Sequence, residues 1–198
     1  MRHEEIEVKF LIADLAAMRQ RLLALGATRK TPRTYEDNWL FDTPDAQLAR
    51  QGRLLRLRRA QRNLITYKEP PTHPDPDFKV RHEYEIEVND FAQARTILQK
   101  LGFTPSGRYE KYRETFTYQA AEIVLDEVPV GMFMEIEAPR EVIRSIATAL
   151  GLDFDARLVV GYGDIFAAVR RTYNLAVTDM TFAALRSLAI DLRACHLH

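Results

Sequence analysis

The chain has 198 residues, of which 46% are hydrophobic, and this is enough to form one sizeable domain with its own core. Lysine and arginine together number 28, as do aspartate and glutamate, so the net charge is zero and a nonspecific nucleic-acid binder of uniformly basic charge is excluded. The single cysteine, Cys195, excludes an intramolecular disulfide and a cysteine-rich metal site, and the lack of a long apolar run or signal pattern predicts a cytoplasmic protein.

The N-terminal segment alternates charged and apolar residues, as a strand with two different faces does. Glu5, Glu7 and Lys9 fall on one side, because side chains two apart share a face of a strand. The phrase Glu-Ile-Glu returns at residues 85–87 and 135–137, and each copy leads into an amphipathic helical pattern that ends at a Leu-Gly pair. The sequence therefore predicts a repeated strand-helix unit, with helices over residues 14–26, 90–102 and 139–151.

The segments between these helices have the composition of strands. Residues 33–41 are rich in aromatic side chains, and residues 53–59 and 63–68 form a predicted hairpin. Several prolines between residues 70 and 76 predict the longest irregular loop.

The signals are weaker beyond residue 151. We expect a last strand or turn over residues 157–166 and a terminal helix over residues 180–194. The predicted organisation is a main domain over residues 1–165 and a C-terminal helical extension, residues 166–198, packed on the same domain.

Charge is sorted by sign along the predicted strands. For any single strand, a solvated outer face is the simpler explanation, because antiparallel sheets often have one wet side. Solvated faces, however, usually mix both charges with Ser, Thr and Gln. We therefore predict an α+β fold: an antiparallel β-barrel with charges inside, apolar residues outside and helices packed on the outside. The same-sign pairs are Glu5 with Glu7, Arg56 with Arg58, Lys111 with Arg113, and Glu135 with Glu137.

An interior of this kind suits a polyphosphate together with a divalent cation. Lysine and arginine bind phosphate oxygens through charge-assisted hydrogen bonds, whereas carboxylates can hold Mg²⁺ or Mn²⁺, which then bridges to the phosphate. The lack of clustered histidine and cysteine argues against zinc, so the predicted cofactor is Mg²⁺ or Mn²⁺. Carboxylates of like charge would repel one another in an empty interior, so we expect Glu7→Gln or Glu135→Gln to leave the unliganded protein at least as stable.

The ordered set of charged motifs between residues 3 and 165 resembles the CYTH superfamily, the triphosphate tunnel metalloenzymes. This resemblance implies an eight-stranded antiparallel barrel whose interior is a triphosphate tunnel, formed by the main domain. The superfamily includes class IV adenylate cyclases, thiamine triphosphatases and inorganic triphosphatases. The motifs are Glu5-x-Glu7-x-Lys9, Leu55-Arg56-Leu57-Arg58, Tyr67-Lys68, Glu83-x-Glu85-x-Glu87, Lys111-x-Arg113, Leu125-Asp126 and Glu135-Ile136-Glu137.

The resemblance also implies roles for the matching residues. The cyclase-like members end on a Ser-Tyr-x-x-Leu element, and this chain departs from that pattern at residues 161–165, Gly-Tyr-Gly-Asp-Ile. The implied phosphate ligands are Lys9, Arg56, Arg58, Lys68, Lys111 and Arg113. The implied metal ligands are Glu5, Glu7, Asp126, Glu135 and Glu137. The implied catalytic group is Glu5, Glu7, Lys9, Lys111 and Asp126.

The implied function is that of a divalent-metal-dependent enzyme acting on a triphosphate, most similar to class IV adenylate cyclases, which convert ATP to cyclic AMP and pyrophosphate. An inorganic or thiamine triphosphatase is the first alternative, because simple triphosphatases also retain a second glutamate at the position of Glu137. A non-catalytic polyphosphate-binding module is the second, and the carboxylates disfavour it because anion binding alone gains nothing from them. The expected partner is a small-molecule triphosphate (ATP, tripolyphosphate or thiamine triphosphate), with no nucleic acid polymer, no membrane, and a homodimer as an option.

Overall fold

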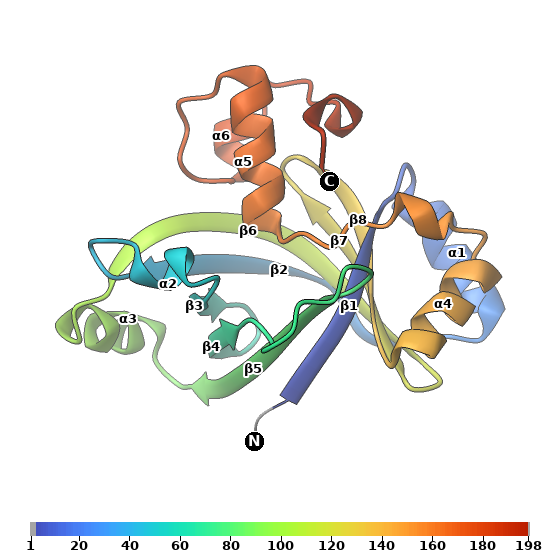
Figure 1. Ribbon diagram of the computed structural model, residues 1–198, viewed down its shortest axis with the longest axis horizontal. Coiled ribbons are helices and arrows are strands. Elements are labelled where there is room, and N and C mark those ends of the chain that lie inside the picture. Colours follow the sequence, from blue (N-terminus) through green and yellow to red (C-terminus); the bar gives the residue numbers. More distant parts are fainter. Residues whose placement is uncertain (1–2, 198) are drawn as a thin grey trace.

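The computed structural model describes residues 3–197, which form a closed barrel of antiparallel strands (Figure 1). The described residues leave out Met1 and Arg2, at the start of the predicted main domain, and His198, at the end of the predicted C-terminal extension. Around the barrel the strands pair in the order β1-β5-β4-β3-β2-β6-β7-β8, and β8 closes the ring on β1. The predicted α+β fold with an eight-stranded antiparallel barrel is therefore confirmed. The strands are β1 (His3–Leu11), β2 (Thr28–Asp42), β3 (Leu54–Arg59), β4 (Asn63–Glu69), β5 (Lys79–Val88), β6 (Thr104–Tyr118), β7 (Ala121–Val128) and β8 (Gly131–Glu137).

The three strands that carry the repeated phrase are each followed by a helix, as the sequence predicts. Asp14 starts the first of these helices by accepting hydrogen bonds from the backbone N–H groups of Ala16 and Ala17, at 2.8 and 3.0 Å. Gly26 ends it with a φ of 96°, a left-handed conformation that glycine adopts without a Cβ clash. The repeated strand-helix unit is confirmed in all three places. Strand β1 leads into α1 (Leu15–Leu25), β5 into α3 (Phe91–Lys100) and β8 into α4 (Arg140–Ala149).

The helices cover the outside of the barrel, where the apolar strand residues point. Val8, Ile123 and Ile136 are fully buried in the same apolar cluster as residues of α1 and α4. On the opposite side of Figure 1, α3 lies near the short helix α2 (Gln47–Arg50), and Leu98 of α3 shares a cluster with Leu57 of β3. Because side chains alternate along a strand, the charged residues between these apolar ones face the barrel interior.

The C-terminal tail differs from the prediction at residues 157–166. Leu158 forms only an isolated bridge with Lys9, and the helix α5 (Tyr162–Tyr173) then begins where we predicted a strand or turn. The helix begins there because the Asp164 side chain accepts a hydrogen bond from the backbone N–H of Gly161, at 2.9 Å. The sequence did not indicate this helix start, because Gly161 and Gly163 are poor helix formers. The apolar residues that follow them do have helical spacing.

The predicted terminal helix over residues 180–194 is also wrong. Two short helices take its place, α6 (Phe182–Leu185) and the 3₁₀ helix η2 (Leu192–Cys195). Asp191 starts η2, because its backbone is extended and its side chain accepts a hydrogen bond from the N–H of Arg193, at 3.0 Å. A second 3₁₀ helix, η1 (Phe154–Ala156), precedes α5.

The tail packs directly on the barrel. Ile165 and Val169 of α5 and Met180 share one buried cluster with Phe133 of β8 and Val130. No helix within residues 3–197 has the length and apolar character needed to cross a membrane. The division at residue 165, the cytoplasmic location and the optional homodimer stay predictions.

Candidate active site in the barrel interior

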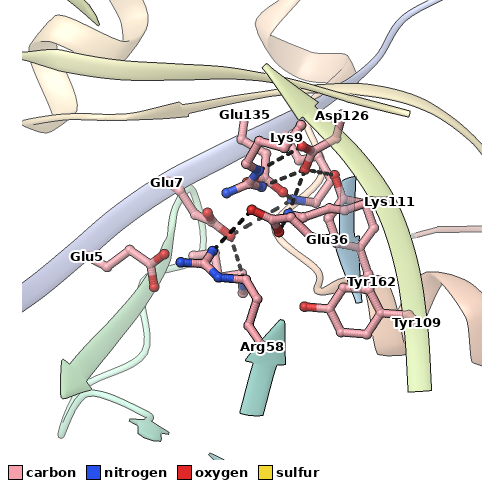
Figure 2. A network of polar contacts seen from close by, with 12 residues as sticks. Glu5, Glu7, Lys9, Glu36, Arg58, Tyr109, Lys111, Asp126, Glu135 and Tyr162 are labelled. Carbon is pink, nitrogen blue, oxygen red and sulfur yellow. Dashed lines mark hydrogen bonds and ion pairs between the residues drawn. The ribbon is translucent and has the colours of Figure 1, made fainter. Parts of the chain in front are cut away.

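The barrel encloses a cavity of about 470 Å³ whose wall is rich in charged side chains. All the predicted phosphate ligands line this cavity, and so do all the predicted metal ligands except Asp126. Figure 2 shows that charged side chains from strands far apart in the sequence point toward one another. The structure therefore brings the predicted site residues together, while their individual roles stay predictions. The predicted residues in the wall are Glu5, Glu7, Lys9, Arg56, Arg58, Lys68, Lys111, Arg113, Glu135 and Glu137.

Two lysines bind the carboxylates of β1. The Lys68 ammonium donates to both carboxylate oxygens of Glu5, at 2.8 and 2.6 Å, and the Lys79 Nζ lies 2.5 Å from Glu7 Oε1. Lys79 stands opposite Glu7 in the register of β1 and β5. Burial would raise the pKa of Glu7, but the positive charges of Lys79 and Lys9 outweigh it and lower the pKa to about 2. Lys79 was not predicted as a site residue, although the alternation of β5 already indicated its place on the charged face.

Asp126 lies beneath the cavity wall as a fully buried acceptor. The Arg113 guanidinium donates to its two oxygens, at 2.7 and 2.5 Å, and Lys111 Nζ donates to Oδ2 at 3.1 Å. Arg113 also reaches Glu135 at 2.6 Å, and Lys9 forms an ion pair with the same carboxylate. Basic side chains contact both oxygens of Asp126, as they do those of Glu5 and Glu135, and its predicted role as a metal ligand stays a prediction.

Ion pairs in the empty interior offset the like-charge repulsion that we expected, and the stability of Glu7→Gln and Glu135→Gln stays a prediction. Carboxylates and basic groups from different strands meet in the wall, so each of Glu5, Glu7 and Glu135 contacts at least one ammonium or guanidinium group. Charged side chains of one sign follow each other along a strand, as Glu5 and Glu7 do, but opposite signs lie next to each other across the strands of the closed sheet. The pKa of Glu135 is held well below its ordinary value, because Lys9 and Arg113 outweigh the effect of burial.

Glu36 belongs to the site although the sequence analysis did not select it. Its carboxylate lies 3.3 Å from Arg58 Nη1 and 3.6 Å from Lys111 Nζ. The neighbouring Asp37 faces outward, where it accepts a hydrogen bond from Arg108 at 2.7 Å. The aromatic Trp39 shares the outward face with Asp37, and this alternation was the signal that could have placed Glu36 inside.

Two tyrosines complete the wall. The Tyr162 hydroxyl donates to Asp126 Oδ2 at 2.8 Å, and the Tyr109 hydroxyl accepts from Arg56 Nη1 at 3.1 Å. Burial and the negative charge of Asp126 raise the pKa of Tyr162 well above its ordinary value, so its phenol stays protonated. Tyr162 comes from the segment that departs from the family pattern, and its position in the site depends on the fold of the tail.

The donor chemistry of the wall fits a divalent cation. Glu5, Glu7 and Glu135 supply the carboxylate oxygens that Mg²⁺ and Mn²⁺ prefer. The carboxylates are not arranged as a formed metal site. Within residues 3–197, no three side chains of His, Cys, Asp or Glu come together closely enough to hold a metal ion. The carboxylates can gather around a cation only if the lysines and arginines turn to another partner, and a polyphosphate has the charge to be that partner.

Solved structures share this fold. A proposed adenylate cyclase from Vibrio parahaemolyticus has a TM-score of 0.75 and 21% identity, with 84% of this chain and 99% of that chain covered. The PH1012 protein from Pyrococcus horikoshii OT3 has a TM-score of 0.68 and 28% identity, over 80% of this chain and 96% of its own. A proposed adenylyl cyclase from Hippeastrum, described as having a dominant triphosphatase activity, has a TM-score of 0.57 and 21% identity, over 84% and 95% of the two chains.

The family comparison agrees with the resemblance of the motifs. No curated protein matches this chain. The family model of the CYTH domain matches residues 3–151, which contain the whole barrel and most of the chain. The chain therefore belongs to the CYTH domain family.

Proposed function

We propose that this protein is a divalent-metal-dependent enzyme that acts on a triphosphate in the barrel interior. The observation that carries the proposal is the convergence of basic side chains and carboxylates on one cavity. Residues such as Arg56, Arg58 and Lys68 would bind phosphate oxygens. A divalent cation, when bound by the carboxylates, supplies positive charge that neutralises the phosphates. Glu5, Glu7 and Glu135 are the side chains that would hold it, with Glu137 beside them.

The cyclisation of ATP is the first candidate reaction. The 3′-oxygen of the ribose would form a bond to the α-phosphorus while the bond to pyrophosphate breaks, and catalysis of such a step is mostly positioning and charge neutralisation. Uncharged residues also line the cavity, among them Leu40, Leu54 and Gly163, and they support a substrate with an organic group.

Hydrolysis is the second candidate. A water molecule would attack the terminal phosphorus and release orthophosphate. Glu137 supports it, because it lines the cavity near Glu135 and adds a carboxylate to the end of the wall. The similar structures carry descriptions of both kinds of activity, and at 21% identity their likeness is a likeness of fold.

Product analysis tests the proposal. The protein is incubated with ATP, tripolyphosphate or thiamine triphosphate and either Mg²⁺ or Mn²⁺, and the products are followed by phosphorus NMR. Cyclic AMP with pyrophosphate identifies a cyclase, and orthophosphate identifies a triphosphatase. Tight binding of all three compounds without any turnover would instead identify a non-catalytic polyphosphate-binding module and reject the enzyme.

A further inference from the structure

Tyr162 lies beyond the part of the chain that matches the CYTH family model, yet its side chain reaches the charged wall. It is the first residue of α5, and only 8% of it is exposed. Its hydroxyl donates to Asp126, and its ring centroid lies 4.5 Å from Lys9 Nζ and 5.4 Å from Lys111 Nζ. One tail residue thus contacts two predicted phosphate ligands and the buried carboxylate behind them.

The tail holds this tyrosine in place. Its ring packs edge-on against Phe133 of β8, with centroids 5.4 Å apart and an interplanar angle of 74°. Just before α5, Leu158 exchanges two backbone hydrogen bonds with Lys9, at 2.7 and 3.0 Å. The same tail segment therefore fixes the backbone of Lys9 and presents a ring to its ammonium group.

The hydroxyl has a distinct chemical task at Asp126. Lys111, Arg113 and Tyr162 all donate to this carboxylate, and Tyr162 is the neutral donor among these three. Tyr162 and Lys111 share Oδ2 of Asp126, so the hydroxyl competes with the ammonium group for one carboxylate oxygen. The face of the ring stabilises the ammonium groups of Lys9 and Lys111 away from water. Through these contacts Tyr162 positions the ammonium groups of Lys9 and Lys111 in the cavity wall, where they can bind an anion.

We propose that Tyr162 is a positioning residue which the C-terminal tail supplies to the site, and that it holds Lys9 and Lys111 ready to bind the phosphates of the substrate. This inference rests on the proposed function, because it takes the phosphates to bind in the barrel interior. It makes the tail a part of the binding site.

Two substitutions of Tyr162 separate its hydroxyl from its ring. Tyr162→Phe keeps the ring against Lys9 and Phe133 and removes the bond to Asp126, whereas Tyr162→Leu removes both. Tyr173→Phe is the matched control. Tyr173 lies on the same helix as Tyr162, and its hydroxyl accepts a hydrogen bond from the N–H of Asp191 at 2.8 Å. Titration calorimetry of the full chain with tripolyphosphate in EDTA measures binding without turnover.

We expect Tyr162→Phe to weaken tripolyphosphate binding about tenfold, the effect of one buried hydrogen bond to a charged group. Tyr162→Leu should weaken it further, and Tyr173→Phe should change it by less than about twofold. If a turnover assay exists, Tyr162→Phe should raise KM more than it lowers kcat, because the lysines bind phosphate before and during the reaction.

The outcomes distinguish the inference from the proposed function. Wild-type protein that binds tripolyphosphate neither in EDTA nor in the presence of Mg²⁺ would reject the proposed function and the inference with it. Wild-type binding that Tyr162→Phe leaves unchanged would reject the inference alone. An equal loss of affinity in Tyr173→Phe would do the same, because it would show that any weakened tail lowers binding.

Discussion

The ammonium group of Lys68 lies 2.8 and 2.6 Å from the two carboxylate oxygens of Glu5, so a predicted phosphate ligand and a predicted metal ligand bind each other. A phosphate that draws Lys68 away would leave Glu5 to a cation, and a cation on Glu5 would leave Lys68 to a phosphate. Binding of the two ligands should therefore be mutually favourable, as linkage requires.

Removing the lysine tests this coupling. We expect Lys68→Met to raise the affinity for Mn²⁺ about fivefold or more in the absence of a triphosphate, because Glu5 loses its competing cation. Electron paramagnetic resonance of free Mn²⁺ measures the change. Arg33→Met, which breaks the exposed pair with Glu127 outside the cavity wall, is the control and should have no such effect. Unchanged Mn²⁺ affinity in Lys68→Met would remove Glu5 from the proposed cation site.

The buried carboxylate of Glu36 predicts a loss of stability in acid. Burial would raise its pKa, but Lys111, Arg113 and Arg58 outweigh burial and lower the pKa from 4.5 to about 2. A pKa lowered in the folded state adds stability that is present above pH 4.5 and is lost as the pH falls toward 2. The full contribution is about 3 kcal/mol.

Urea unfolding between pH 6 and pH 2.5 measures this contribution. The free energy of unfolding of Glu36→Gln should fall less steeply than that of the wild type over this range, because the variant has no carboxylate to protonate. Glu141→Gln, an exposed position in α4, should keep the wild-type slope. The same steep slope in Glu36→Gln would mean that other carboxylates cause the acid sensitivity.

Glu135→Gln should destabilise the unliganded protein, contrary to the expectation from like-charge repulsion. The substitution leaves Lys9 and Arg113 in a buried wall without one of their negative partners. Breaking a buried ion pair from one side costs about 3–5 kcal/mol. Thermal unfolding of Glu135→Gln beside Glu122→Gln, which loses only an exposed pair, measures the difference. A melting temperature for Glu135→Gln equal to that of the wild type would restore the repulsion hypothesis.

Two neighbouring arginines provide a test of the interior as a phosphate site. Arg58 faces the cavity, whereas Arg59 faces outward and binds Asp37 at 2.9 Å. We expect Arg58→Gln to raise the KM for a triphosphate about tenfold or more, since it removes a charged phosphate ligand, and Arg59→Gln to leave KM within about twofold. Equal effects of the two substitutions would argue against phosphate binding inside the barrel.

Ligands of different length should stabilise the protein to different extents. Only a chain of phosphates can contact Arg58, Lys68 and Lys111 at once, so tripolyphosphate with Mg²⁺ should raise the melting temperature more than orthophosphate with Mg²⁺. A ligand present at 100 times its Kd raises the free energy of unfolding by about 2.7 kcal/mol. Tripolyphosphate without a cation should stabilise less, because its charge then meets the carboxylates. Equal shifts at matched ionic strength would show that these charges act only as a solvated surface.

The sequence by itself determined the barrel, its repeated units and its inverted polarity. Strict alternation, as between Glu7 and Val8, assigns each side chain to a face, and the Leu-Gly endings mark where the helices stop. These are local properties, and neighbouring residues decide them. The same alternation places the predicted phosphate ligands inside the barrel before any pairing is known.

Only the tertiary structure decided which charges meet. Lys68 and Glu5 are 63 residues apart in the chain, and their contact depends on β1 and β4 both flanking β5. Glu36 meets Arg58 and Lys111 because β3 and β6 flank β2, and Tyr162 reaches the site because the tail packs on Phe133. Contacts between distant segments depend on strand order and register, which a pattern of single residues does not contain. For this reason the residue types of the site could be predicted from the sequence, and their partners could not.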